Sequence, residues 1–528
     1  MPVVSLVASS PVCGAADERS VALVVDQKFG IPLASELTRL GADISADLGT
    51  CVRTLTVQDG DSAQSIRRSL QALRSGHGLQ GAVLIGDIPA VLFGDYAGFP
   101  NVSPFLTDSY YEVLNDRYWV DANNNGVFDR TFDLDGDGVA SLLLDVASDA
   151  RSRDIWTGRL TPPKGGAQDE RVEQLRRYLD RNHAYRIGTK SYEPRMLYMN
   201  SAHRDSFPTD SSFRAEVQQK DAEAMYRASR LFVAPPSEAL SSIWNDEMAT
   251  QRQIWRQAIQ APVTYTYVNT HGTSQAQSAV EANSWTDFTS ADLVRTPYNG
   301  LLLDFVSCSN ADFSDQNYFA GNALFLGQSL AVRAFSSVVL VTGRGAAPMS
   351  VRLLGSGLTL GEIKKFSAAI DSYVIVGDPT LRLKPRSGLF GEIPVVAELT
   401  FPALSVDFVA TANPKQSIRL RNAGDRSISI HRSEQVLGTS WQERGTLNRS
   451  IPIPSANVGR IGIEPSFVED AGIVPPETIA PGESVMLNVY FVKAYAGSKP
   501  GVYRWMGVFD SDDPSMPVFA IKAFQKLE

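Results

Sequence analysis

The sequence predicts an α/β region of two halves with largely parallel sheets, followed by an all-β sandwich. Up to about residue 386, apolar runs typical of buried strands alternate with helical segments, the pattern that builds parallel sheets. Beyond that point the apolar runs are short and are separated by Pro/Gly turns, as in a β-sandwich. The chain of 528 residues is long enough for two to four domains of roughly 100–200 residues each.

The first half, residues 1–160, opens with the apolar run VALVVD at 21–26, which predicts a strand. Two helices are expected next, because 33–42 ends at a glycine and 62–76 is amphipathic behind a serine cap. Two further apolar runs complete this half as buried strands, at 81–87 and 154–160.

The second half, residues 161–386, begins with a long polar helix expected at 168–187. The apolar stretch 317–335 is expected to be helical as well. Strands that each end in a turn are expected at 194–201, 263–272, 300–310, 336–343 and 372–379. After a linker at 386–394, the sandwich occupies residues 395–528.

Charge and composition exclude several classes of partner. The chain has 58 Asp+Glu against 49 Lys+Arg, a net charge of −9, which argues against nucleic acid because phosphates require a basic surface. No apolar run approaches the ~18 residues of a membrane span. We therefore expect no nucleic-acid partner and no membrane span, and the oligomeric state is left open. Of the three cysteines, Cys13 and Cys51 could pair in an oxidising compartment, which leaves Cys308 as the odd thiol.

Most of the net negative charge lies between Asp108 and Asp154, where eleven acidic and four basic residues give a net charge of −7. The motifs DANNNG and DLDGDG in this segment have oxygen-bearing side chains at alternating positions before a glycine, as calcium-binding loops do. Phe132 and Leu144 stand where an intact EF-hand has its glutamate. We expect a structural Ca²⁺ site, one or two ions, with ligands from Asp121, Asn123, Asn125, Asp129, Asp133, Asp135, Asp137 and Asp145. A surface turn pair without an ion is the alternative.

One histidine and one cysteine each end an apolar run. His271 follows VTYTYVNT, and Cys308 follows GLLLDFVS. In an open α/β sheet the carboxyl ends of neighbouring parallel strands form the ligand crevice. A Cys beside a His suits nucleophilic acyl transfer, because the imidazole assists thiolate formation and protonates the leaving amine. A core cysteine and an ordinary hydrogen-bonded histidine are the structural alternative.

The chain resembles the gingipain-like cysteine peptidases of the caspase-like clan in six motifs, which occur in the same order. They are AVLIGDIP, TDSYYEV, the Asp/Gly turn before a strand ending in GRL, YVNTHGT, FVSCSNADF and the GDPTL ending. The resemblance covers roughly residues 20–386 and implies a caspase-like catalytic region. It makes Cys308 the nucleophile and His271 the general acid/base, with backbone N–H groups of Gly272 and Cys308 as oxyanion donors. Asp87, at the end of AVLIGD, matches an acidic residue that orients the His in the family.

The same resemblance suggests substrate-binding residues. Asp108 matches the position at the bottom of the primary specificity pocket in arginine-specific members, and Met349 falls in the pocket wall. A buried carboxylate at this position would favour Arg or Lys before the cleaved bond; alternatively, Asp108 serves the calcium region or the fold. We expect Asp304, inside LLLDFVSC, to be a buried hydrogen-bonded anchor rather than part of the site. Residues 395–528 resemble the immunoglobulin-like domain of the family.

The sequence therefore predicts a cysteine endopeptidase that hydrolyses peptide bonds through an acyl-enzyme, with protein or peptide substrates. Two alternatives stay open: a non-catalytic, calcium-bearing surface binding or adhesion protein, and a cysteine hydrolase or transferase that acts on a non-peptide acyl group. The resemblance implies a secreted or cell-surface protein. Because the start of the chain lacks the basic and long apolar regions of a signal peptide, a cytoplasmic location is the alternative.

Overall fold

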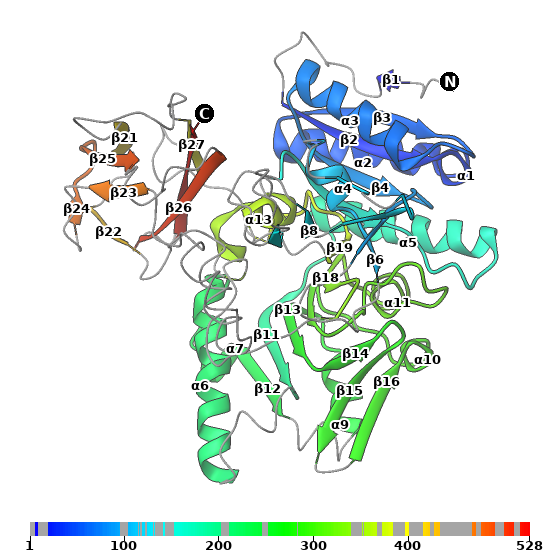
Figure 1. The fold of residues 1–528 in the computed structure, drawn as a ribbon. Coiled ribbons are helices and arrows are strands. Elements are labelled where there is room, and N and C mark those ends of the chain that lie inside the picture. The colour runs from blue at the N-terminus through cyan, green and yellow to red at the C-terminus, as the bar shows by residue number, and fades with distance from the viewer. Residues whose placement is uncertain are drawn as a thin grey trace.

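A computed structural model gives the structure of the chain (Figure 1). It describes residues 6–8, 19–94, 104–114, 116, 119–121, 124–129, 131–132, 141–142, 153–201, 211–244, 252–281, 284–338, 351, 353–366, 372–383, 396–400, 415–422, 427–432, 467–470, 477–491, 501–511 and 518–527.

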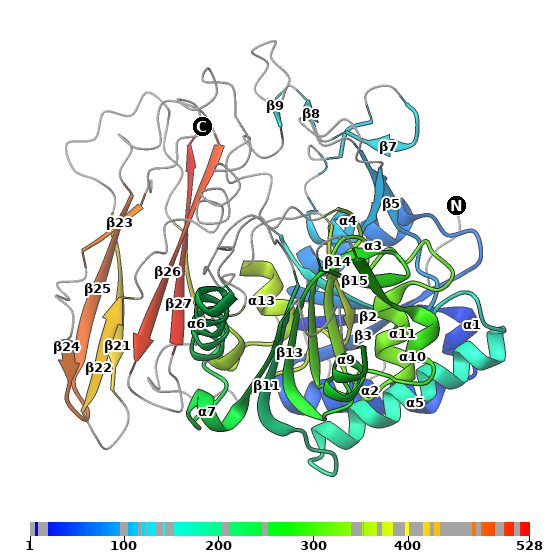
Figure 2. The same cartoon turned by 90° about the horizontal axis from the view of Figure 1, so that it is seen from below.

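A central sheet organises the α/β region, and helices pack on both of its faces (Figures 1 and 2). Among the described residues this sheet has eleven strands. Their order is β1 (Leu6–Ala8), β3 (Cys51–Val57), β2 (Ser20–Asp26), β4 (Leu79–Ile85), β10 (Trp156–Leu160), β19 (Tyr373–Gly377), β18 (Ala331–Phe335), β17 (Leu302–Val306), β13 (Val263–Asn269), β11 (Glu193–Asn200) and β12 (Leu240–Trp244). The strands of the two predicted halves thus belong to one continuous sheet rather than to two.

The sheet is mostly parallel, as predicted, but its two parts run in opposite directions. Neighbouring strands are parallel except for the pairs β1–β3 and β18–β19. Because β19 is parallel to β10 and antiparallel to β18, the carboxyl ends of β4 and β10 lie at one edge of the sheet. The carboxyl ends of β13 and β17 lie at the other edge. This reversal decides which strand-end residues can meet.

The helices of the α/β region follow the strands. They are α1 (Gln27–Gly30), α2 (Ala34–Leu48), α3 (Ala63–His77), α4 (Ser109–Glu112), α5 (Gln168–Arg186), α6 (Ser211–Ser229), α7 (Pro236–Ala239), α9 (Arg252–Ala258), α10 (Ser290–Leu293), α11 (Phe319–Leu326) and α13 (Leu360–Phe366). The Ser62 side chain caps α3 by accepting from the Ser65 N–H, which confirms the predicted serine cap.

Alternating residues of β2 separate two cores. Val21 and Leu23 pack in the core that contains residues of α2 and α5. Ala22 and Val24 pack in a second core with residues of α3 and α4. Side chains of a strand alternate between the two faces of a sheet, so one apolar run can serve both cores. This explains why the predicted strands read as continuous apolar runs.

The expected helix at 317–335 is wrong in its second part. Helix α11 ends at Leu326, and strand β18 begins at Ala331 and lies between β17 and β19. A side chain at Gly327 would lie 1.9 Å from the Tyr298 carbonyl oxygen, so the chain turns where only glycine fits. The strand expected at 336–343 falls largely outside the described residues.

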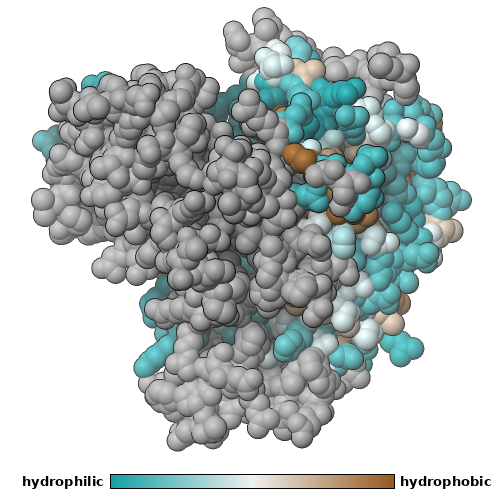
Figure 3. Space-filling model, in the orientation of Figure 1, coloured by the Kyte–Doolittle hydropathy of each residue, from teal (hydrophilic) through white to brown (hydrophobic). Residues whose placement is uncertain are grey.

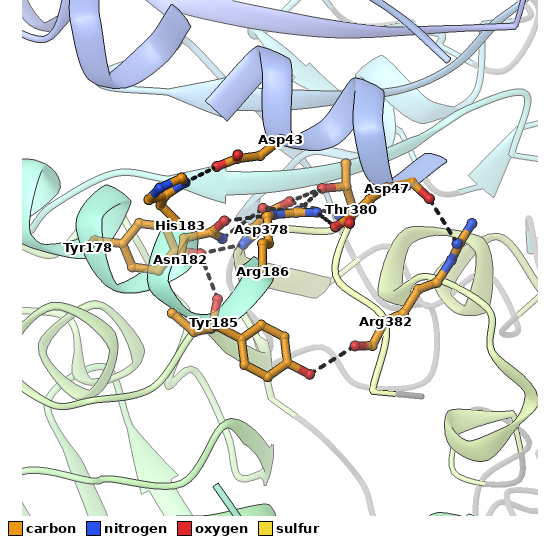
Figure 4. Close-up of polar contacts among 11 residues, drawn as sticks. Asp43, Asp47, Tyr178, Asn182, His183, Tyr185, Arg186, Asp378, Thr380 and Arg382 are labelled. Atoms are coloured by element: carbon orange, nitrogen blue, oxygen red, sulfur yellow. Dashed lines mark hydrogen bonds and ion pairs between the residues drawn. The ribbon is translucent and has the colours of Figure 1, made fainter. Parts of the chain in front are cut away.

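A polar network holds α2, α5 and the turn after β19 together (Figure 4). The buried Asp378 carboxylate accepts hydrogen bonds from Arg186 at 2.7 Å and from Asn182 at 2.8 Å. It also accepts the N–H and the hydroxyl of Thr380. Burial opposes the charge of Asp378, but Arg186 and Thr380 outweigh it, so the pKa of Asp378 lies below its ordinary value. The GDPT word of the sequence is thus a structural turn.

Smaller sheets surround the central one. They are β14 (His271–Thr273) with β15 (Ala276–Glu281) and β16 (Ser284–Thr289); β5 (Val91–Phe93) with β6 (Phe105–Thr107) and β7 (Val127–Phe128); and β8 (Thr131–Phe132) with β9 (Ser141–Leu142).

Beyond residue 395, the described strands form two sheets, as an all-β region requires. One is β20 (Val396–Thr400), β27 (Val518–Leu527), β26 (Gly501–Ser511), β22 (Ile428–Arg432) and β24 (Glu477–Ile479), and the other is β21 (Lys415–Arg421), β25 (Ser484–Phe491) and β23 (Phe467–Asp470). The immunoglobulin-like assignment stays a prediction.

The described surface seen in Figure 3 is mostly hydrophilic over the α/β region. Within the part of the chain that the structure describes, no helix combines the length and the apolar character needed to cross a membrane.

Candidate active site

Strands β13 and β17 bring His271 and Cys308 to neighbouring positions. The two strands are parallel, with Tyr267 opposite Asp304 and Asn269 opposite Val306. His271 and Cys308 each lie two residues beyond this last pair. Neighbouring strands are about 4.8 Å apart, so the backbones at these two positions leave the sheet side by side.

The register is held past the ends of the strands. The Thr270 N–H donates to the Val306 carbonyl oxygen at 3.3 Å, and the Thr270 and Ser307 hydroxyls lie 2.9 Å apart in a hydrogen bond. Both residues are buried. Their hydrogen bond therefore holds together the two chain segments that lead into His271 and Cys308.

Gly272 lies against the backbone of the cysteine. A side chain at this position would lie 2.7 Å from the Cys308 carbonyl oxygen and 2.9 Å from the Cβ of Ser307, which is closer than real Cβ contacts allow. The His-Gly word of the sequence therefore has a physical reason. Only glycine lets the chain after His271 approach the backbone of Ser307 and Cys308 this closely.

The residue after the cysteine has an unusual backbone. Ser309 has a φ of 56°, in the left-handed region where a non-glycine residue costs about 1–2 kcal/mol. Its N–H donates to the Ser337 carbonyl oxygen at 2.9 Å. Strain of this kind is typical of functional sites, where the surrounding structure imposes it.

A buried amide chain locks the β14–β15 hairpin onto the loop after Cys308. The fully buried Asn310 side chain donates to the carbonyl oxygens of Thr273 at 2.7 Å and Ala276 at 3.0 Å. Its Oδ1 accepts from Gln277 Nε2 at 3.0 Å, and Gln277 Oε1 accepts from the Tyr298 hydroxyl at 2.8 Å. The strand that begins with His271 is thus fastened to the loop that follows the thiol.

The two reactive side chains differ in exposure. His271 is exposed, and Cys308 is half-buried. Cys308 is not in a disulfide, whereas Cys51 is disulfide-bonded. Cys13, the partner expected from the sequence, lies outside the described residues. A thiol that is outside any disulfide and is partly accessible fits the chemistry expected of a nucleophilic cysteine.

Asp304 is a buried anchor, as predicted. Its carboxylate pairs with Arg333 and accepts from the Tyr265 hydroxyl at 2.9 Å. Burial opposes the charge of Arg333, but Asp304 outweighs it and raises the pKa of Arg333. The pair ties β17 to β18 beneath the dyad.

Asp87 follows β4, at the opposite edge of the sheet from His271. Its carboxylate accepts two hydrogen bonds from the Arg171 guanidinium, at 2.6 and 2.8 Å. Burial opposes the charge of Asp87, but the hydrogen bonds and charge of Arg171 outweigh it, so the pKa of Asp87 is lowered. The structure thus gives Asp87 a role in anchoring α5, and its orientation of His271 stays a prediction.

Asp108 lies in a segment that approaches the cysteine loop. Ser336 donates to the carbonyl oxygen of Leu106 at 2.7 Å, and this places the TDSYY segment beside the loop after Cys308. The Asp108 carboxylate is 1% exposed and holds the equally buried Arg159 by two hydrogen bonds. A substrate arginine would have to displace Arg159 to reach this carboxylate.

Few of the predicted calcium ligands can be placed. Asp121 accepts the N–H groups of Asn125 at 3.0 Å and Gly126 at 2.8 Å, and Asn125 Oδ1 accepts the Val127 N–H. Asp129 donates its N–H to the Val120 carbonyl oxygen. Within the described residues, no three acidic, His or Cys side chains gather to hold an ion. The other expected ligands lie outside the described residues, namely Asn123, Asp133, Asp135, Asp137 and Asp145, as does Met349 of the expected pocket wall.

One buried ion cluster could not be found from the sequence. Its centre, Glu112, is fully buried and contacts Arg153 at 2.7 Å and Lys364 at 2.5 Å. Burial opposes its charge, but these cations outweigh it and lower the pKa of Glu112. In the sequence, the only feature that points to this cluster is the arginine that begins the strand-like motif RDIWTGRL. The motif does not indicate which acidic residue this arginine contacts.

Comparisons with known proteins give weak likenesses. No model of a protein family and no curated protein matches the chain. The Arg-specific cysteine proteinase gingipain R is similar in structure, with 12% identity, a TM-score of 0.45 and coverage of 97% of this chain and 98% of that one. The Vibrio cholerae VesB protease shares 14% identity over 25% of this chain and 30% of its own, with a TM-score of 0.14. A PapD-like domain of human CEP192 shares 13% over 25% and 80%, with a TM-score of 0.16. These scores are too low to carry a functional conclusion, so the function is argued from the chain's own residues.

Proposed function

We propose that the chain is a cysteine hydrolase that cleaves peptide bonds, with Cys308 as nucleophile and His271 as general acid/base. The supporting observation is the parallel pairing of β13 with β17, whose last pair, Asn269 and Val306, lies two residues before His271 and Cys308. The close approach of Gly272 to the Cys308 carbonyl and the strained φ of Ser309 support the same spot.

The mechanism uses these residues in two steps. The Cys308 thiolate attacks the scissile carbonyl carbon, and the backbone N–H groups of Gly272 and Cys308 stabilise the oxyanion. When the C–N bond breaks, the His271 imidazolium gives its proton to the leaving amine and a thioester remains. Water then attacks the thioester, His271 accepts its proton, and the carboxylic acid product leaves the thiol.

Two further features belong to the proposal without entering these steps. The disulfide at Cys51 supports an oxidising compartment, and so an exported protein. The Asp/Asn loops around Asp121 support a structural Ca²⁺ that would stiffen the acidic segment. Selectivity for Arg or Lys through Asp108 would require the substrate to replace Arg159.

Peptide-library cleavage by the full chain tests the proposal. We expect Cys308→Ala and His271→Ala each to abolish turnover while the chain keeps its melting temperature. His183→Ala is the matched control, because this histidine pairs with Asp43 between α5 and α2 (Figure 4) and should leave turnover in place. If Cys308→Ala still cleaves peptides, Cys308 is not the nucleophile. Cleavage of acyl esters but of no peptide would favour the alternative of a non-peptide hydrolase.

A further inference from the structure

The histidine of the proposed dyad begins a row of side chains that crosses the β14–β15–β16 sheet. These three strands are antiparallel, with His271 opposite Ser278 and Ser278 opposite Asp287. Side chains directly opposite each other in an antiparallel pair stand on the same face, with Cβ atoms about 4.5–5.5 Å apart. The three side chains therefore line up in sequence from the imidazole to the carboxylate.

The known contact within this row sets its polarity. The Ser278 hydroxyl donates to Asp287 Oδ1 at 2.6 Å. A hydroxyl has one proton to give and two lone pairs, so Ser278 can only accept from any group on its other side. An imidazole N–H of His271, across the strand, is a donor. Ser278 is buried at 6% exposure, while Asp287 is exposed, so the hydroxyl lies between the solvated carboxylate and the dyad.

We propose that Ser278 and Asp287 are positioning residues that orient the His271 imidazole and stabilise its charged form. The proposal rests on the proposed function of His271. Asp287 draws the hydroxyl proton of Ser278 toward itself, which makes Ser278 a stronger acceptor for the ring N–H. The other ring nitrogen then faces Cys308 as the acceptor of its proton. Neither residue touches the substrate; both act through His271.

In this proposal, Ser278 and Asp287 take the role of orienting His271 that the sequence analysis assigned to Asp87. Asp87 pairs with Arg171 at the other edge of the sheet, whereas Asp287 is reached from His271 through one cross-strand neighbour. The turn of the same hairpin contains a similar contact that points elsewhere. The Ser274 hydroxyl donates to Asp315 Oδ2 at 2.7 Å, and Gln275 also donates to this carboxylate. Ser274 is not paired with His271 in the sheet, so Asp315 supplies a matched control.

The test compares Asp287→Asn, Ser278→Ala and Asp315→Asn in the full chain. The tautomer of His271 is read by nitrogen NMR on chains labelled at histidine, with His271→Gln identifying its signals. We expect one dominant tautomer in the parent chain and in Asp315→Asn, and a mixture in the other two variants. Turnover of a peptide reporter should fall by about tenfold or more in kcat with KM little changed, a part of the ~10²–10⁴-fold that general acid–base catalysis supplies. Asp287→Glu should restore part of this loss.

The outcomes separate the two proposals. Unchanged His271 signals in both Asp287→Asn and Ser278→Ala would overturn the row, whatever the turnover, and would leave the Ser278–Asp287 bond as a pin between β15 and β16. A parent chain without peptide cleavage would overturn the proposed function, while the nitrogen signals would still decide whether the row exists. If Asp287→Asn or Ser278→Ala lowers the melting temperature, the other variant and the His271 nitrogen signals still test the row. The two variants interrupt the row at different residues.

Discussion

Replacing Asp108 by Asn distinguishes a structural carboxylate from a substrate-binding one. Asp108 and Arg159 are each 1% exposed and are joined by two hydrogen bonds. Asn has the same shape but no charge, and its amide N–H₂ cannot accept from the guanidinium. Arg159 would keep one hydrogen bond to the amide oxygen of the new side chain, its bond to the Ile88 carbonyl oxygen at 2.8 Å and its position 4.1 Å over the Phe313 ring.

The structure sets the size of the effect. Removing one partner of a buried ion pair typically costs ~3–5 kcal/mol, because the other charge stays buried without compensation. Arg159 keeps a carbonyl acceptor and a ring beneath its guanidinium, so we expect the lower end, about 3 kcal/mol. That is roughly a hundredfold in the ratio of folded to unfolded chain, and a melting temperature lower by roughly 3–4 °C for a region of this size.

The measurement is thermal and urea unfolding of the full chain at neutral pH, paired with reporter kinetics. Asp116→Asn is the matched control: Asp116 also pairs with a buried arginine, Arg67, but is 79% exposed. Because water screens this pair, we expect it to cost less than about 1 kcal/mol. We also expect the ratio of kcat/KM between Arg-ending and neutral reporters to be the same in Asp108→Asn as in the parent chain.

One combination of results would refute this reasoning. If Asp108→Asn unfolds like the control but loses its preference for Arg-ending reporters, then the carboxylate faces substrate. Arg159 would then leave it when substrate binds. The sequence-based pocket would be correct, and the ion pair would be a resting arrangement of the empty site.

Three further outcomes are expected. Gly272→Ala should abolish peptide turnover, because its Cβ would lie 2.7 Å from the Cys308 carbonyl oxygen; turnover near the parent level would contradict the close approach. The pKa of Asp378 is lowered on folding, so its contribution to stability is present above its unfolded pKa and is lost as pH falls through the lower folded value. The acid melting curve of Asp378→Asn should therefore be flatter than that of the parent. Removing calcium with a chelator should lower the melting temperature of the chain. An unchanged melting temperature, together with no calcium in elemental analysis, would contradict the proposed calcium site.

The local pattern of apolar residues predicts most strands of the central sheet. The one strand that it assigns to a helix, within residues 317–335, has a physical explanation. Buried strands of a parallel sheet read as short apolar runs, and so the strands around 21–26 and 263–272 could be predicted. The stretch 317–335 is also apolar throughout, and an apolar run by itself does not separate a buried helix from a buried strand. The break at Gly327 depends on the Tyr298 carbonyl, about thirty positions away in the chain. No local rule contains that contact.

The neighbouring strands that lead into His271 and Cys308 could be predicted, whereas the place of Asp287 could not. The two residues follow parallel strands that are neighbours, as the positions of the apolar runs predict. Asp87 also ends a strand, but the antiparallel pair β18–β19 reverses the sheet between them. That reversal is a matter of long-range pairing, which the order of apolar runs does not record.

Asp87 and Asp108, which the sequence offers as site residues, share one structural explanation with the buried Glu112. A carboxylate can be buried only if a cation comes with it, and one short segment supplies three such cations. Arg153, Arg159 and Arg171 pair with Glu112, Asp108 and Asp87, respectively. The net charge of −7 between residues 108 and 154 already counts Arg153, but Arg159 lies outside that segment and neutralises Asp108. The charge left for a cation to balance is therefore smaller than the sequence count suggests. By contrast, Asp287 is an exposed acid whose strand partner is the neighbour of His271, so its place in the fold, more than its charge, points to the dyad.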